Sequence, residues 1–133
     1  MYPVLIVGKL EEDKAKVLGG FIKWQRKDAV GNINDPEGLK KHFAYYHYPF
    51  SAVCEAVKMV EEIKKGVENI AVPTLLIHSK GDKTIDWRSS KWIYNTITSK
   101  DKDLLLLKKS NHVLFLDYDK ETVMNKIVSF LQD

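Results

Sequence analysis

The sequence has 133 residues, which is typical of a single domain. Its 44% hydrophobic and 29% charged residues are ordinary for a globular protein, which excludes a disordered chain, a collagen-like repeat and a disulfide scaffold. The 21 basic and 18 acidic residues leave a net charge of +3, and the two signs are interleaved along the chain, so the sequence shows no basic stripe for nucleic acid.

Cysteine content and hydropathy predict where the protein works. Cys54 is the single cysteine, so it cannot form an internal disulfide, and we expect a reducing, cytoplasmic location. No apolar run approaches the ~20 residues that a membrane helix requires. Residues 2–7 are also too short for the apolar part of a signal peptide. We therefore expect no transmembrane segment.

Helical patterns dominate the first half of the chain. Residues 3–7 fit either a strand or the start of a helix, and residues 11–27 predict a helix that Gly19-Gly20 weakens. Residues 28–38 predict a loop, because they contain Gly-Asn and Asn-Asp-Pro turn signals. A short helix over residues 39–46 and a longer one, with Pro49 at its first position and its end near residue 65, complete this half.

Strands and helices alternate after Pro73. Residues 74–77, inside a predicted strand over residues 73–79, and residues 104–107 are continuous apolar runs, which are typical of parallel strands buried on both faces. Asp86 is a good N-cap for a helix between them, and a last helix carries Val123 and Ile127. This β-α-β-α order predicts an α/β fold with a right-handed parallel unit.

The predicted sheet is small for strands of this kind. Two strands, or three with residues 3–7, are few for a sheet covered on both faces. The pattern therefore indicates the end of a larger sheet.

Two ionisable residues follow the two predicted strands. Asp82 comes after the first strand and His112 after the second. Functional residues of open α/β sheets lie at the carboxyl ends of the strands, so a carboxylate and an imidazole would meet at one edge. This is the arrangement of an orienting acid and a general base. The alternative is that Asp82 is a turn residue and His112 an ordinary loop histidine.

These segments resemble a known family. The sequence VPTLLIHSKGDKTI, residues 72–85, resembles the seventh strand and acid loop of α/β-hydrolase carboxylesterases and monoacylglycerol lipases, and Ser110-Asn111-His112-Val113 resembles their histidine loop. The resemblance covers residues 70 to 131 and implies that Asp82 and His112 are the acid and base of a serine esterase. Residues 11–67 are similar to the helical cap of those enzymes. The resemblance thus implies a cap-like segment over residues 1–69 and a core part over residues 70–133.

The nucleophile of such an enzyme is missing from the sequence. The nucleophile elbow requires Gly-x-Ser-x-Gly, and none of the seven serines has both glycines: Ser51, Ser79, Ser89, Ser90, Ser99, Ser110 and Ser129. We expect the carboxyl-terminal part of an esterase or lipase, inactive alone and able to hydrolyse acyl esters only with a serine-bearing amino-terminal half. The alternatives are a non-catalytic binding or assembly module on a hydrolase-derived scaffold, and a hydrolase with a different nucleophile.

Other residues fit less specific roles. By resemblance, Tyr45, Tyr46 and Phe50 would line an acyl pocket in the cap, but packing between two helices explains them equally well. Cys54 lies on an apolar helix stripe and fits a small core residue. His78 lies in a buried strand pattern without a second nearby donor, so we expect no metal site and no cofactor.

The incomplete sheet also predicts self-association. An unpaired strand edge between apolar faces favours pairing with another chain. The simplest arrangement is a two-fold homodimer that extends the sheet and buries Leu75, Ile77, Leu105 and Leu107.

Overall fold

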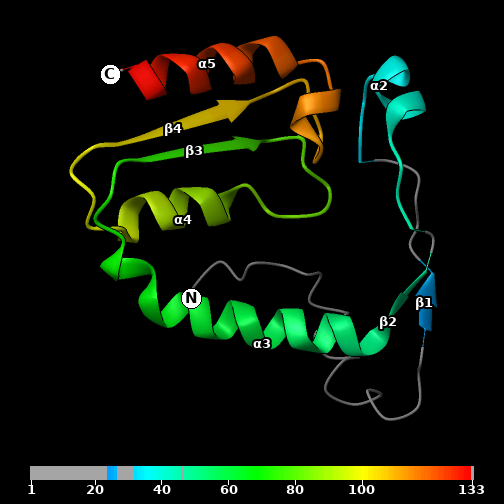
Figure 1. Ribbon diagram of the computed structural model, residues 1–133, viewed down its shortest axis with the longest axis horizontal. Helices are drawn as coiled ribbons and strands as arrows, with labels where there is room; N and C mark the ends of the chain where they lie inside the picture. Colours follow the sequence, from blue (N-terminus) through cyan, green and yellow to red (C-terminus); the bar gives the residue numbers. More distant parts are fainter. Residues whose placement is uncertain (1–23, 27–31, 46, 133) are drawn as a thin grey trace.

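The computed structural model describes residues 24–26, 32–45 and 47–132, and Figure 1 shows their arrangement. The strand or helix expected over residues 3–7 lies outside the described residues, as do residues 11–23 of the expected first helix. In the second half, strand β3 (Thr74–Ser79), helix α4 (Arg88–Thr96), strand β4 (Lys102–Leu107) and helix α5 (Lys120–Gln132) follow one another. The strands are parallel, which confirms the α/β fold class.

The first half contains two short strands that the sequence did not predict, over residues 24–26 and 47–49. Strand β1 (Trp24–Arg26) pairs antiparallel with strand β2 (His47–Pro49), with Trp24 opposite Pro49. The expected helix over residues 11–27 is therefore wrong at its end. Cross-strand pairing supplies this short segment with backbone partners that its local helical pattern does not predict.

Helix α2 (Pro36–Lys41) begins earlier than expected and ends before residue 46. Asp35 caps it by accepting a hydrogen bond from the backbone N of Glu37 at 3.0 Å. The Asp-Pro pair that we assigned to a loop is thus an N-cap followed by a proline in the first turn. Helix α3 (Phe50–Gly66) agrees with the expected long helix, except that Pro49 is its N-cap and not its first residue.

The alternation of side chains along β3 and β4 defines the two faces of the sheet. Lys126 of α5 forms an ion pair with Asp103, so Asp103 and Leu105 face α5 together with their neighbours in register, Leu75 and Ile77. The other face, with His78, contacts α4. Figure 1 shows α5 and α4 on opposite sides of the two strands.

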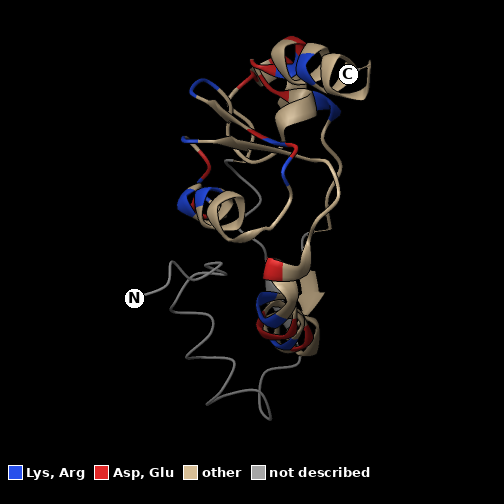
Figure 2. Ribbon diagram, turned by 90° about the vertical axis from the view of Figure 1, so that its left-hand side faces the viewer, with Lys and Arg blue, Asp and Glu red and all other residues tan. Residues whose placement is uncertain are grey.

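The cover on these faces is incomplete. Within the two strands only Ser79 and Leu107 are buried, and all other strand residues are partly exposed. The expected burial on both faces is therefore not reached within this chain. In Figure 2 the ribbon of α3 carries both acidic and basic residues. None of the described helices is long and apolar enough to cross a membrane.

Candidate catalytic site

The register of β3 and β4 brings two loops to the same edge of the sheet. Ser79 lies opposite Leu107, so the strands end level with each other. The backbone N of Lys80 donates to the carbonyl of Leu107 at 2.9 Å, which holds the start of the first loop beside the end of β4. Asp82 and His112 follow these ends and therefore meet.

Further hydrogen bonds fasten the two loops together. The buried hydroxyl of Ser79 donates to the carbonyl of Ser110 and accepts from the backbone N of Gly81 at 3.1 Å. The backbone N of Lys83 donates to Oδ1 of the buried Asn111 at 3.1 Å. Gly81 is needed for this approach, because a Cβ there would lie 2.9 Å from the carbonyl oxygen of Ser110.

Asp82 and His112 form the centre of the site. Nδ1 of His112 lies 2.9 Å from Oδ2 of Asp82, and the other oxygen of this carboxylate accepts from the backbone N of Thr84 at 2.7 Å and of Ile85 at 2.9 Å. The Asp82 side chain is 3% exposed and that of His112 is 34% exposed. No described residue hydrogen-bonds to Nε2 of His112, so this nitrogen is free to exchange a proton with a ligand.

The surroundings of Asp82 favour its charged form. Burial of the carboxyl raises its pKa, but the hydrogen bonds from His112, Ile85 and Thr84 and the charge of His112 outweigh burial, so the pKa lies below its ordinary value. Because an ionised carboxylate only accepts hydrogen bonds, Nδ1 of His112 carries the proton in this contact. A neutral His112 then has its lone pair on Nε2, as a general base requires.

A second carboxylate, Asp117, holds the histidine loop from behind. It is fully buried and accepts four backbone hydrogen bonds of 2.7 to 2.9 Å, two on each oxygen, from Asn34, Asp35, Asn111 and Tyr118. These amides outweigh the effect of burial and lower the pKa of Asp117. The carbonyl of Asn32 also accepts from the backbone N of His112 at 3.0 Å. The loop before α2 therefore supports His112.

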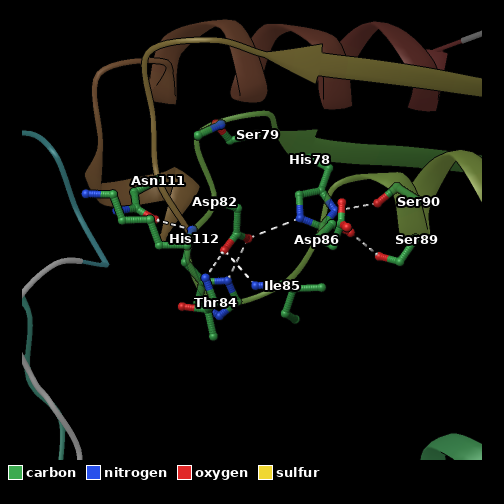
Figure 3. A network of polar contacts seen from close by, with 12 residues as sticks. His78, Ser79, Asp82, Thr84, Ile85, Asp86, Ser89, Ser90, Asn111 and His112 are labelled. Atoms are coloured by element: carbon green, nitrogen blue, oxygen red, sulfur yellow. Dashed lines mark hydrogen bonds and ion pairs between the residues drawn. The ribbon is translucent and has the colours of Figure 1, made fainter. Parts of the chain in front are cut away.

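The structure adds His78 to the site, which the sequence argument considered only as a metal ligand. Its Nε2 lies 3.1 Å from the same Asp82 oxygen that contacts His112, and its Nδ1 contacts the hydroxyl of Ser90 (Figure 3). The usable signal was position, because His78 precedes Asp82 by four residues at the end of the strand.

The proposed acyl-pocket residues are not joined to this pair by any described polar contact. Tyr45 is 80% exposed and stacks edge-on against Phe43, whereas Phe50 is 2% exposed. Tyr46 lies outside the described residues. Cys54 is partly buried. Among the described residues, no group of three or more His, Cys, Asp or Glu side chains could hold a metal ion.

Curated proteins similar to this chain are esterases and lipases. It is 26% identical over 114 residues to the carboxylesterase of Bacillus subtilis (strain 168), which is 85% of this chain and 46% of that protein. It is 25% identical over 104 residues to the thermostable monoacylglycerol lipase of Bacillus sp. (strain H-257), covering 77% of this chain and 41% of the lipase. The chain thus spans slightly less than half the length of these relatives.

Solved structures and a family match give the fold and the family. A structure of the metagenome-derived lipolytic enzymes LipS and LipT superposes with a TM-score of 0.84 at 23% identity, over 96% of this chain and 51% of the other. The monoacylglycerol lipase of Paleococcus ferrophilus gives 0.78 at 20% identity, over 98% and 54%. These likenesses show the α/β-hydrolase fold. Residues 41–119 match the family described as "Serine aminopeptidase, S33", so the chain belongs to this family of α/β-hydrolases.

Proposed function

We propose that this chain supplies the acid and base of a serine esterase that hydrolyses acyl esters. Asp82 would orient the imidazole, and His112 would be the general base. The observation that carries the proposal is the 2.9 Å contact from Nδ1 of His112 to a buried carboxylate, with Nε2 left free among the described residues. The carboxylesterase and monoacylglycerol lipase among its relatives support acyl esters as the substrate class.

The proposed reaction follows from this orientation. Nε2 of His112 takes the proton from a serine hydroxyl while the serine oxygen attacks the acyl carbonyl, and the imidazolium then gives its proton to the leaving alcohol. Water repeats the sequence on the acyl-enzyme and releases the acid. Asp82 stabilises the imidazolium and keeps the proton on Nδ1.

The nucleophile would come from outside these 133 residues. None of the seven serines has the Gly-x-Ser-x-Gly surroundings of a nucleophile elbow. The two serines nearest the loops, Ser79 and Ser110, are fully buried, and Ser79 donates to the carbonyl of Ser110. We therefore expect the chain alone to be inactive. In this proposal residues 70–133 form the catalytic part and residues 1–69 a cap-like segment.

The partly exposed sheet supports a second element of the proposal, which is that the isolated chain self-associates. Among the described residues β3 and β4 pair only with each other, so each has an outer edge without a strand partner. A two-fold dimer would extend the sheet and cover its apolar side chains. Light scattering over a concentration series tests this, and a chain that stays monomeric would contradict it.

The single cysteine supports a reducing, cytoplasmic location.

A fusion experiment tests the catalytic role. The amino-terminal part of the Bacillus subtilis carboxylesterase that precedes its matched region is fused to this chain, and hydrolysis of a short p-nitrophenyl ester is measured. We expect no hydrolysis by the chain alone and measurable hydrolysis by the fusion. His112→Ala should abolish it, and Asp82→Asn should reduce kcat by about 10⁴-fold, because the wrong imidazole tautomer is then favoured.

His47→Ala is the matched control, because His47 is exposed on β2 and shares no described contact with the site. It should leave the rate unchanged. A folded fusion that is inactive, or one that is indifferent to both His112→Ala and Asp82→Asn, would contradict the proposed function.

A further inference from the structure

Four donors surround the Asp82 carboxylate, and one of them has no role in the reaction proposed above. Thr84 and Ile85 donate their backbone N–H groups to Oδ1, and His112 donates to Oδ2. The fourth donor is Nε2 of His78, at 3.1 Å from Oδ2. A carboxylate offers about four lone-pair positions, so the acceptor capacity of Asp82 is filled.

The partners of His78 determine which of its nitrogens carries the proton. An ionised Asp82 accepts only, so Nε2 of His78 must be protonated. In the neutral ring Nδ1 is then an acceptor, and the hydroxyl of Ser90 is its donor. The opposite tautomer would place two lone pairs against each other at Oδ2. Because the side chain of His78 is 12% exposed and Ser90 is 7% exposed, water has little access to replace either contact.

Three elements are joined by these contacts. His78 is in β3, Ser90 is in α4 and Asp82 is in the loop between them. The two amides act on Oδ1, whereas Oδ2 is contacted by the two histidine rings. Nε2 of the His78 ring contacts Oδ2, the same oxygen that His112 contacts (Figure 3). Asp86, the other carboxylate near His78, is paired with Arg88 at 2.5 Å.

We propose that His78 is a positioning residue that holds Oδ2 of Asp82 toward His112, and that Ser90 fixes the ring of His78 for this task. The proposal rests on the proposed function, because it is the esterase reaction that uses the oriented imidazole of His112. Its physical content is independent of any nucleophile. It states that the tautomer of His112 depends on His78.

Nitrogen-15 NMR of the imidazole rings tests the proposal on the chain as it is. The sequence has four histidines, and the two outside the site, His42 and His47, give internal references. In the unsubstituted chain at a pH where the rings are neutral, we expect His78 to be protonated on Nε2 and His112 on Nδ1. The exposed His47 should show the mixture of a free imidazole.

Substitutions then separate positioning from packing. His78→Phe keeps a ring but removes the donor, so the Nδ1-protonated population of His112 should fall toward the mixture shown by His47. His78→Gln, whose amide can donate to the same oxygen, should restore much of it. Ser90→Ala should shift the tautomer of His78 itself and shift His112 less. His47→Phe is the matched control and should change neither ring.

The outcomes are distinguishable from those of the esterase test. An unchanged His112 tautomer in folded His78→Phe would overturn the proposal, and so would a loss that folded His78→Gln does not reverse. If His78→Phe does not fold, folded His78→Gln and Ser90→Ala decide. A positioning role requires His112 to keep a larger Nδ1-protonated population in His78→Gln than the mixture that His47 shows, and requires Ser90→Ala to shift the tautomer of His78. A His112 mixture like that of His47 in folded His78→Gln would overturn the proposal. Failure of the fused chain to hydrolyse esters would leave all of these signals unaffected.

Discussion

The loops at the carboxyl edge of the sheet bury polar side chains, whereas the strands that carry them leave apolar side chains partly exposed. Most proteins show the opposite distribution. Four polar residues at this edge are fully buried: Ser79, which is the last residue of β3, and the loop residues Ser110, Asn111 and Asp117. The apolar residues of β3 and β4, apart from Leu107, are only partly buried. Polar groups are thus inside and aliphatic ones partly outside within a few residues of each other.

The difference separates a region whose polar groups are all hydrogen-bonded from a region whose apolar groups are only partly covered. In the part of the chain that the structure describes, no buried side-chain nitrogen or oxygen lacks a hydrogen-bond partner, so the polar groups of the loop region are satisfied, some of them by the segment before α2. The strands differ, because their apolar side chains become buried only where another surface covers them. Polar contacts therefore hold the loops that carry Asp82 and His112, whereas most side chains of β3 and β4 stay partly exposed.

The largest test of this contrast is removal of the Asp117 carboxylate. Asp117→Ala leaves four backbone N–H groups without their acceptor, and each unsatisfied buried donor costs about 1–3 kcal/mol. We expect a loss of more than about 3 kcal/mol of unfolding free energy, measured by urea denaturation. Asp101→Ala, at an exposed carboxylate, should cost little. Equal effects of the two substitutions would show that the loop region does not depend on this network.

Close backbone contacts give the next largest effects. A Cβ at Gly38 would lie 1.6 Å from the carbonyl oxygen of Leu116, and one at Gly81 would lie 2.9 Å from that of Ser110. Gly38→Ala and Gly81→Ala should each destabilise the fold by about 1–3 kcal/mol, with Gly38→Ala the larger, because backbone must move. At Gly66, at the end of α3, a Cβ would meet nothing within 4 Å, so Gly66→Ala should be neutral or slightly stabilising in thermal melts.

Acid should weaken the loop region in a specific pH range. The pKa values of Asp82 and Asp117 are lowered below the ordinary value of about 3.9, so both groups stabilise the fold fully above that value. This stabilisation is lost as the pH falls from about 4 through the lowered pKa values, because the unfolded chain then binds more protons. Urea midpoints measured from neutral to acid pH test this. Asp117→Asn should show a shallower decline, and an identical decline would contradict the assignment to Asp117.

The smallest effect on folding is expected on the half-exposed strand face. Leu105→Gln should lower the unfolding free energy by about 1 kcal/mol or less, because only part of the side chain leaves an apolar environment. The same change at the buried Leu107, on the same face, should cost clearly more. Leu105→Gln should also weaken self-association in light scattering. If Leu105→Gln destabilises the monomer as much as Leu107→Gln does, this face is not an interface between copies of the chain.

The sequence by itself determined the second half of the chain well. Continuous apolar runs and loop residues after each strand predicted the parallel β-α-β-α order, because these are local or short-range signals. The expected N-cap at Asp86 was wrong by one residue, because the N-cap of α4 is Trp87. The proximity of Asp82 and His112 was predictable for the same reason, since parallel strands bring their carboxyl ends to one edge. The absence of a Gly-x-Ser-x-Gly motif from these 133 residues is also readable directly from the serines and glycines.

Only the tertiary structure decided the rest. The pairing of β1 with β2 joins residues more than twenty positions apart, and Asp117 accepts from Asn34, which lies 83 positions away. No local pattern encodes such partners. His78 looked like an apolar-strand residue until α4 placed Ser90 against it. Periodicity reports which side of an element is apolar, whereas hydrogen-bond partners and actual burial depend on which distant segment comes to cover that side.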